Sequence, residues 1–443
     1  MDGSGVVDKE NQGFPFLQSL PVIRKNALKR SVPFGSDDTN IKKRKKDLPT
    51  YFEYIHHSKW IADNYVDLQL IGKGAFGIVY RARCRSDESK IVAIKEILKK
   101  KVSDPMNAAV CEITLVKELG GKRNILPTIA THESRGSMDM GNFVVMEYFP
   151  HDPFQDVIKI INSEEIIHYG VNLISALEYL HANLIIHRDV KPDNFLYNRA
   201  QRRYALIDFG LSQRYNKNID RAEELKKKFK DGASVSPGQK RNRIQMPCSC
   251  DSVMTEPCTS CKMKEKFVVN KAGTPRFLAP EVLIGSAKQT TKMDIWAVGM
   301  ILFYMVVRNY RFFAARDELA MILELSAVFG TESFEQIGRD VGIELTTTVK
   351  FRRLNLKHFC LAHRYGLKGF GVKKNCEYCR YYFRRPLTRC FCSPRDSSKE
   401  FRKYVGKNDE KIGKLLDYCL QVDPSKRPGS TELLEMFGNE KSL

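Results

Sequence analysis

Two kinds of apolar segment are missing from this sequence. The first twenty residues, which begin MDGSGVVDKENQ, lack the basic start and apolar stretch of a secretory signal, so we expect the chain to stay inside the cell. No apolar run has the length needed to cross the ~30 Å hydrocarbon core of a bilayer. The longest run, IWAVGMILFYMVV at residues 295–307, has the length of a buried core helix. We therefore predict no transmembrane segment and no membrane partner.

Acidic residues are too few to balance the basic ones. The chain has 73 Lys and Arg against 52 Asp and Glu, a net charge of +21, which favours nucleic acid, acidic protein segments or nuclear import receptors as partners. The densest basic feature is KKRKK at residues 42–46, with Lys29 and Arg30 upstream. We interpret residues 1–55 as a disordered basic tail with a two-part nuclear localisation signal, which predicts a nuclear protein. A solvated charge run is the alternative.

No internal repeat is evident, and 443 residues are enough for two lobes with extensions. Residues 60–150 alternate apolar and polar positions around a Gly-rich turn and include one helical stretch, which predicts a small antiparallel sheet with one helix. Residues 151–437 are mostly helical by their spacing. Two stretches, 213–270 and 331–408, are rich in Lys, Arg, Ser and Cys with little periodicity. We interpret them as inserts, because patterned segments resume after each.

A glycine-rich turn separates the first two predicted strands. In IGKGAFGIVY, Gly72, Gly74 and Gly77 form a G-x-G-x-x-G pattern that is followed by Val79. Glycines let backbone amides approach phosphate oxygens without a Cβ in the way. The strand that follows argues against a dinucleotide-binding fold, in which a helix would follow. The pattern alone is weak, because glycine-rich hairpins are common in proteins that bind no nucleotide.

A lysine lies among apolar residues of the third predicted strand. Lys95 ends the sequence VAIK, and a buried ammonium without a counter-charge is costly. Glu112, on the helix that follows, is the candidate partner. Together they would hold the α- and β-phosphates of a nucleotide. The alternative is a strand lysine whose charged end reaches solvent.

The sequence IIHRDVKPDNFLY concentrates polar residues in one short loop after a helix. Asp189 can orient a hydroxyl acceptor and take its proton, and Lys191 can neutralise charge on a transferred phosphoryl group. Asn194 offers an amide oxygen to Mg²⁺. Asp208, in LIDFG, adds the hard anionic oxygen that Mg²⁺ prefers. Any one of these residues alone could be an ordinary surface side chain.

The ordered set of motifs resembles that of eukaryotic protein kinases. It runs from the glycine loop, lysine and glutamate through HRDVKPDN and DFG to APE at residues 279–281, and chance does not account for the whole set. The resemblance covers residues 65–330 and 409–437, apart from the inserts. It implies a bilobal α+β kinase fold, ATP in the cleft between the lobes and phosphate transfer to a protein hydroxyl. DVKPDN resembles the serine/threonine kinases rather than the tyrosine kinases.

The same resemblance implies roles for further residues. Thr274 is placed beside the catalytic aspartate and lysine, and Asp294 is placed as the buried carboxylate that braces the catalytic loop. Arg427 is implied to pair with Glu281 in a structural role. Met146 would guard the adenine pocket, whose edge the backbones of Glu147 and Phe149 would meet. The implied nucleotide-binding residues are Ile71, Gly72, Gly74, Gly77, Val79, Ala93, Lys95, Glu112, Met146, Glu147 and Phe149.

Eight of the twelve cysteines form two clusters, one in each predicted insert. Disulfides are disfavoured in a reducing cell, so close cysteine pairs favour metal ligation. The first cluster has the order C-x-C then C-x-x-C, enough thiolates for a structural Zn²⁺ site that would order its insert. Loose, solvated thiols are the alternative. The second cluster reverses that order, and Cys360 and His363 lie nearby as alternative ligands. The candidate zinc ligands are Cys248, Cys250, Cys258 and Cys261, and then Cys376, Cys379, Cys390 and Cys392.

The position of the inserts narrows the resemblance. A CSC…CTSC segment that ends directly before AGTPRFLAPE, and a second interruption before the last helices, are similar to the cell-division-cycle-seven family of replication-initiation kinases. That resemblance implies a nuclear kinase with an activating regulatory subunit. It also implies serine substrates in acidic surroundings, such as the minichromosome maintenance helicase. The Cys-rich composition of the second insert departs from this family.

Two other interpretations stay open on the sequence alone. One is a different nuclear serine/threonine kinase with convergent inserts. The other is a pseudokinase scaffold on chromatin, although pseudokinases commonly lack a catalytic group and none is missing here. Direct contact with nucleic acid is left open by the composition.

Overall fold

A computed structural model describes most of the region that carries the kinase-like motifs. The described residues are 52–74, 77–97, 105–133, 141–215, 273–286, 288–315, 317–341, 343, 345, 350–365 and 404–438. They divide into two compact units, an α+β architecture that confirms the predicted fold class. We call residues 52–151 with 196–210 the sheet unit, and residues 152–195 with 211–438 the helical unit.

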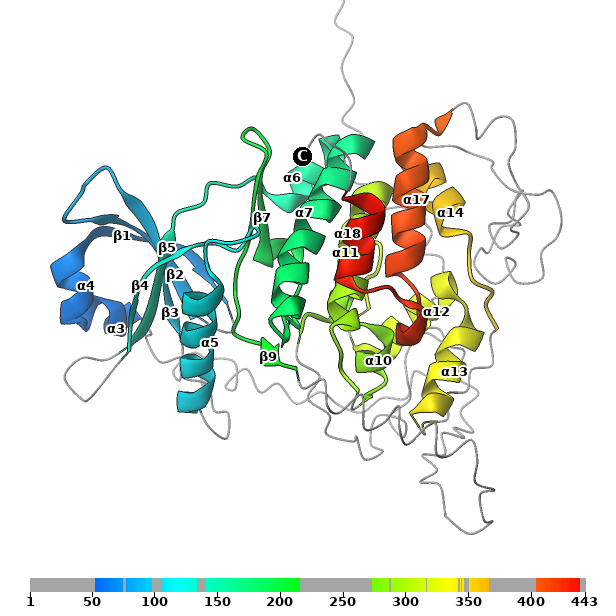
Figure 1. The fold of residues 1–443 in the computed structure, drawn as a ribbon, viewed down its shortest axis with the longest axis horizontal. Coiled ribbons are helices and arrows are strands. Elements are labelled where there is room, and N and C mark those ends of the chain that lie inside the picture. The colour runs from blue at the N-terminus through cyan, green and yellow to red at the C-terminus, as the bar shows by residue number, and fades with distance from the viewer. Residues whose placement is uncertain are drawn as a thin grey trace, which may run out of the picture. The chain divides into compact units, whose positions relative to one another are not determined.

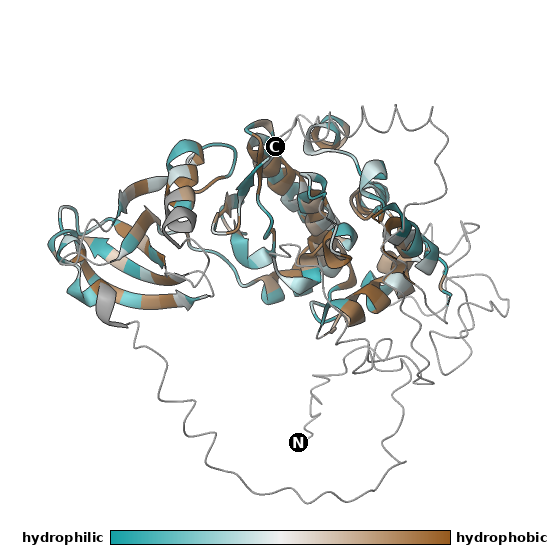
Figure 2. Cartoon of the chain, turned by 90° about the horizontal axis from the view of Figure 1, so that it is seen from below, coloured by the Kyte–Doolittle hydropathy of each residue, from teal (hydrophilic) through white to brown (hydrophobic). Residues whose placement is uncertain are grey.

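The sheet unit is built on five antiparallel strands in the order β1-β2-β3-β5-β4 (Figure 1). The strands are β1 (Tyr65–Lys73), β2 (Gly77–Cys84), β3 (Ile91–Ile97), β4 (Thr128–His132) and β5 (Asn142–Glu147). Along β2 buried and less buried residues alternate, whereas β3 and most of β5 are buried on both faces; the strands carry both brown and teal residues in Figure 2. Tyr80, Ile94 and Phe143 are among the residues of the hydrophobic core.

Two short helices precede the first strand. They are α3 (Phe52–His57) and α4 (Lys59–Asn64), and Ile55 and Ile61 pack into the same core as the strands. The Ser58 hydroxyl caps α4 by accepting a hydrogen bond from Ile61 N at 3.4 Å. The folded region therefore begins a few residues before the end of the tail predicted for residues 1–55. The basic run at 42–46 lies outside the described residues.

A later segment of the chain returns to the sheet unit. It holds most of β7 (Phe195–Asn198) and the whole of β8 (Arg203–Leu206), which pair with each other. Leu206 accepts a hydrogen bond from Leu126 N at 3.1 Å and donates its own N–H to Asn124 O at 2.6 Å. These bonds fix the segment that leads into Asp208. The helix between β3 and β4, α5 (Pro105–Leu119), carries Glu112.

The helical unit surrounds a central apolar helix. Its helices are α6 (Phe154–Ile160), α7 (Ser163–Ala182), α10 (Pro280–Leu283), α11 (Lys292–Val307), α12 (Glu318–Phe329), α13 (Thr331–Asp340), α14 (Leu356–Arg364), α17 (Lys407–Cys419) and α18 (Ser430–Phe437). The apolar run at residues 295–307 is buried within α11, as predicted for a core helix, and α11 contacts α7, α14 and α17. No helix of the described ranges is long and apolar enough to cross a membrane.

Polar caps explain where several of these helices begin. Asn162 and Glu165 form a capping box before α7, with bonds of 2.9 and 3.1 Å between each side chain and the other residue's backbone N–H. The Asn355 side chain accepts from His358 N at 3.1 Å at the start of α14. The catalytic-loop region lies between β6 (Ile185–Ile186) and the 3₁₀ turn Pro192–Asn194. β6 pairs with β9 (Gln213–Arg214).

The second predicted insert, residues 331–408, is more regular than its sequence indicated. Its described part forms α13 and α14, and α14 packs on α11 and α17 with Phe359 and Cys360 fully buried. These helices have 10 and 9 residues, shorter than the windows in which helical periodicity is a clear signal. Part of this segment therefore belongs to the core of the helical unit.

Candidate active site

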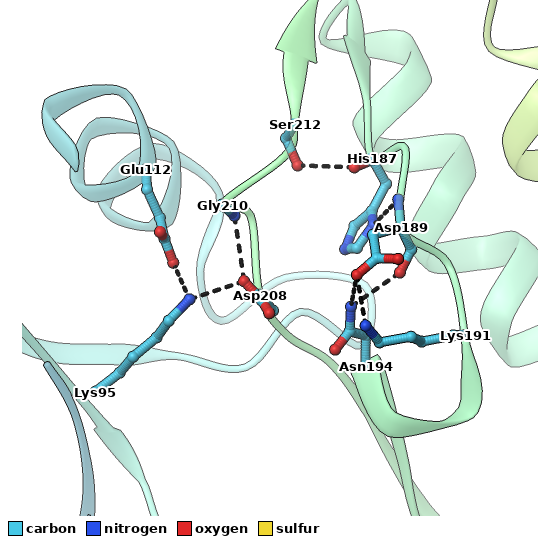
Figure 3. A network of polar contacts seen from close by, with 9 residues as sticks. All are labelled: Lys95, Glu112, His187, Asp189, Lys191, Asn194, Asp208, Gly210 and Ser212. Atoms are coloured by element: carbon cyan, nitrogen blue, oxygen red, sulfur yellow. Dashed lines mark hydrogen bonds and ion pairs between the residues drawn. The ribbon is translucent and has the colours of Figure 1, made fainter. Parts of the chain in front are cut away.

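A buried ion-pair network forms in the sheet unit around Lys95. Its Nζ atom lies 2.5 Å from Glu112 Oε1 and 2.7 Å from Asp208 Oδ1 (Figure 3). Lys95 is 7 % exposed, and β3 is buried on both faces around it. Burial alone would lower the pKa of Lys95, but the carboxylates of Glu112 and Asp208 raise it above its ordinary value. The lysine stays charged, so it can attract the phosphates of a nucleotide.

The glycine turn lies beside Lys95, at the start of β2. The hairpin closes through a hydrogen bond from Gly74 N to Gly77 O at 2.9 Å. A Cβ at Gly77 would come within 2.5 Å of the Glu96 carbonyl oxygen and 3.1 Å of Lys95 Cε, so only glycine fits there. Among the described residues, the nearest atom that a Cβ would meet lies 3.7 Å away at Gly72 and 3.8 Å away at Gly74. The packing of these described residues does not explain glycine at the two positions, whereas close approach of a phosphate would.

The residues that the sequence predicted around the adenine include Met146 and Phe149, which lie in an apolar surface of the same unit. The register of β3 and β5 pairs Ala93 with Met146, and Phe149 follows β5 in a cluster with Leu126 and Ala205. Met146, Leu196 and Ile207 pack against that cluster as half-buried side chains. The sequence prediction did not include Leu196 and Ile207. The sequence offers only an indirect signal for them: Leu196 lies two positions after Asn194, and Ile207 directly precedes Asp208. The other predicted residues of this surface, Ile71 and Val79, lie on β1 and β2, and Glu147 ends β5.

The helical unit holds a second network, centred on the Asp189 carboxylate. Lys191 Nζ lies 2.6 Å from Asp189 Oδ2, and Thr274 Oγ1 donates to Oδ1 at 2.7 Å. Asn194 Nδ2 donates to Asp189 Oδ2 at 3.1 Å and to its carbonyl oxygen at 2.9 Å. Figure 3 shows Lys191 and Asn194 directed at the aspartate. The structure thus brings together the catalytic-loop residues and the threonine that the sequence predicted beside them.

The Asp294 carboxylate holds the backbone of the catalytic loop in place through two hydrogen bonds. It accepts the backbone N–H of His187 at 2.8 Å and of Arg188 at 2.9 Å. Arg188 adopts a left-handed backbone with φ of 69°, which these bonds help to hold. Gly273, with φ of +128°, lies so near that a Cβ would come within 2.7 Å of the Arg188 carbonyl oxygen. The brace predicted for Asp294 is therefore present.

A buried ion pair stabilises the helical unit away from Asp189. Arg427 Nη1 and Nη2 lie 2.9 and 3.2 Å from the two carboxylate oxygens of Glu281. The guanidinium also stacks over Trp296, 5.3 Å from the ring centroid, and both side chains of the pair are almost fully buried. This is the structural pairing that the sequence predicted.

The sequence predicted two oxygen donors for Mg²⁺, and each unit holds one of them, Asn194 in the helical unit and Asp208 in the sheet unit. The Asn194 amide nitrogen is engaged by Asp189, which leaves its Oδ1 for a cation. Asp208 has a left-handed φ of 67°, and Gly210 N donates to its Oδ1 at 3.2 Å. An amide oxygen and a carboxylate oxygen are each the kind of donor that Mg²⁺ takes, beside phosphates and water. Within the described ranges, no group of three or more His, Cys, Asp or Glu side chains could hold a metal by itself.

The predicted zinc ligands cannot be placed in the same way. All eight cysteines of the two clusters lie outside the described residues. The alternative ligands Cys360 and His363 lie on α14. Burial raises the pKa of the Cys360 thiol well above its usual range and lowers the pKa of His363 to about 4. The Cys360 side chain belongs to the packed core, so it is not an accessible thiolate.

Comparison with known proteins places these features in a family. The "Protein kinase domain" family model matches residues 65–230 and 258–437, and the unmatched part between them lies inside the first predicted insert. The chain is 30 % identical over 290 residues to "Probable cell division control protein 7 homolog 2" of Encephalitozoon cuniculi, which covers 65 % of this chain and 77 % of that protein.

Two further relatives are less similar to the chain. The chain is 25 % identical over 394 residues to "Cell cycle serine/threonine-protein kinase hsk1" of Schizosaccharomyces pombe, covering 86 % of this chain and 68 % of that protein. It is 23 % identical over 433 residues to "Cell division cycle 7-related protein kinase" of Homo sapiens, covering 71 % and 74 %.

Proposed function

We propose that this chain, which belongs to the protein kinase family and is a serine/threonine kinase similar to cell division control protein 7, phosphorylates acidic protein segments to promote initiation of DNA replication. The observation that carries the catalytic part is the convergence of Lys191, Asn194 and Thr274 on the Asp189 carboxylate. A pseudokinase is disfavoured, because no catalytic group is missing and the relatives bear the names of kinases.

The transfer step follows from the Asp189 network. The hydroxyl oxygen of the substrate attacks the γ-phosphorus of ATP, the bond to the oxygen bridging the β- and γ-phosphates breaks, and ADP leaves. Asp189 orients the hydroxyl and accepts its proton. Thr274 and Asn194 fix the carboxylate through one hydrogen bond to each oxygen. Lys191, 2.6 Å from the carboxylate, is placed to neutralise charge on the transferred phosphoryl group.

The Lys95 network binds the rest of the nucleotide. Glu112 holds the ammonium of Lys95 for the α- and β-phosphates, and the apolar surface around Met146 accommodates the adenine. Mg²⁺, when bound with ATP, shields the phosphate charge from Asp208 and Asp189. Asp208 and Asn194 are the residues that would hold it.

Acidic substrates are supported by the charge of the chain. A net charge of +21 attracts acidic protein segments that come within about a Debye length of the chain, and it repels basic segments. The minichromosome maintenance helicase is the substrate that the family resemblance implies. A panel of serine peptides tests this part: flanking Asp or Glu should raise kcat/KM over flanking Lys, Arg or Pro. Equal rates, or a preference for basic or proline flanks, would point to another kind of nuclear kinase.

The remaining parts of the proposal concern activation, zinc and location. We expect an activating subunit to raise turnover, which affinity capture from nuclear extract followed by a kinase assay would detect.

The C-x-C and C-x-x-C pairs of residues 248–261 would bind structural Zn²⁺. Metal analysis tests this, since Cys258→Ser should lower the zinc content of the purified chain.

We also expect residues 42–46 to direct nuclear import. Replacing these lysines and the arginine with alanine should then leave the chain in the cytoplasm.

A further inference from the structure

A chain of hydrogen bonds joins the last described helix to the catalytic loop within the helical unit. Ser430 Oγ lies 3.0 Å from His181 Nδ1, and His181 Nε2 lies 3.0 Å from Asp294 Oδ2. Asp294 in turn accepts the backbone N–H groups of His187 and Arg188. Ser430 is 4 % exposed and Asp294 is 1 % exposed, so water competes little for these bonds.

The chemistry of the groups fixes which atoms carry protons. A carboxylate only accepts hydrogen bonds, so the His181 nitrogen that faces Asp294 carries a hydrogen. In the neutral ring, the nitrogen that faces Ser430 is then an acceptor, and the serine hydroxyl donates to it. In the other neutral tautomer, a lone pair of His181 would face the Asp294 carboxylate. The Ser430 hydroxyl can donate to the first tautomer or accept from the second, so the Asp294 carboxylate selects the tautomer and Ser430 fixes the direction of the ring.

The Ser430 hydroxyl is not needed to begin its own helix. The residue before α18 is Gly429, and its backbone N–H is capped by the Glu432 carboxylate at 2.8 Å. The one hydrogen bond of the Ser430 side chain within the described residues goes to His181. A capping role therefore does not explain a buried hydroxyl at this position.

We propose that Ser430 is a positioning residue for phosphotransfer, which acts by fixing the direction of the His181 ring so that Nε2 donates to Asp294. Asp294 then keeps both carboxylate oxygens on the catalytic-loop backbone, which sets the position of Asp189. Loss of the Ser430 hydroxyl removes the hydrogen bond on one side of the ring and loosens this loop. The inference rests on the proposed phosphotransfer activity, but amide exchange of the loop can be measured without it.

The test uses the full chain with Ser430→Ala, Ser430→Cys and the matched control Thr431→Ala. Thr431 is the next residue and is exposed. The ¹⁵N signals of the histidine rings report which nitrogen carries the hydrogen, and the signal that disappears in His181→Gln identifies His181 among the 9 histidines. The kcat and the KM for ATP are measured on the same proteins, together with amide exchange of the catalytic loop.

The wild type and Ser430→Ala should both show hydrogen on Nε2, whereas the amides of His187 and Arg188 should exchange faster in Ser430→Ala. Loss of one buried hydrogen bond predicts a fall in kcat of about fivefold with the KM for ATP unchanged. Ser430→Cys should fall between the two, and Thr431→Ala should match the wild type. In a His181→Ala background, Ser430→Ala should have no further effect on kcat.

Unchanged amide exchange of the catalytic loop and an unchanged kcat in Ser430→Ala would overturn the inference. Equal losses in Ser430→Ala and Thr431→Ala would overturn it as well, because they would indicate a general effect on α18. A wild type without phosphotransfer would refute the proposed function instead, and the amide exchange of the loop would still decide the role of Ser430.

Discussion

The hydroxyl of Thr274 donates to Oδ1 of Asp189 at 2.7 Å, which ties the segment after the first predicted insert to the catalytic loop. The same hydroxyl accepts a hydrogen bond from Lys191 Nζ at 3.2 Å. Thr274 thereby holds one carboxylate oxygen while Asn194 and Lys191 hold the other. The orientation of the catalytic carboxylate is set by groups far apart in the sequence.

Thr274→Ala should lower kcat by about tenfold, because a hydrogen bond to a charged group contributes roughly 1.5–3 kcal/mol and here it orients the proton acceptor. Thr274→Ser keeps the hydroxyl and should retain most of the activity. Steady-state kinetics on both variants checks this. Equal activity of the alanine and serine variants would show that the hydroxyl does not position Asp189.

Glu96 predicts a pH dependence of stability in the sheet unit. Burial raises the pKa of this carboxyl from 4.5 to about 7, and its Oε2 atom has no hydrogen-bond partner among the described residues. The folded state therefore holds a proton that the unfolded chain releases between these pH values. Stability should fall as the pH rises from about 4.5 to above 7.

Glu96→Gln removes this titration, and its neutral side chain needs no charge desolvation. Relative to the wild type, the free energy of unfolding of Glu96→Gln should therefore increase by about 1–2 kcal/mol as the pH rises from 5 to 8. Urea unfolding across that range measures it. A difference that is independent of pH would mean that Glu96 titrates normally in the folded protein.

The two glycines Gly77 and Gly74 should respond differently to alanine. A Cβ at Gly77 would lie 2.5 Å from the Glu96 carbonyl oxygen, so Gly77→Ala should destabilise the protein by about 1–3 kcal/mol and disturb Lys95. A Cβ at Gly74 would meet no described atom nearer than 3.8 Å, so Gly74→Ala should leave stability unchanged while weakening ATP binding. Thermal unfolding and nucleotide titration separate the two effects. Equal destabilisation by both variants would contradict the packing argument.

The sequence predicts which polar groups of the motifs come together, because motif spacing reflects contacts that the fold must bring about. The lysine of VAIK needs a counter-charge, and Glu112 supplies it at 2.5 Å. Residues that act through packing leave no such pattern. Leu196 and Ile207 join the nucleobase surface only because β8 bonds back to residues 124–126, a pairing between segments that periodicity does not reveal.

The second predicted insert shows another limit of sequence patterns. Phe359 and Cys360 are buried in a helix of 9 residues, and its short apolar face is obscured by Lys, His and Arg around it. Ser430 and His181 also gave no signal, because a serine and a histidine 249 positions apart become partners only when α7 and α18 pack together.

The most direct test of the account is nucleotide binding and phosphotransfer by Asp189→Asn. Asparagine keeps the shape of the side chain but cannot accept the hydroxyl proton as a carboxylate does. We predict that transfer to an acidic serine peptide falls by at least about a hundredfold, while the dissociation constant for ATP with Mg²⁺ stays within a factor of about three. Wild-type transfer rates in this variant would contradict the assignment of Asp189, and with it the proposed reaction.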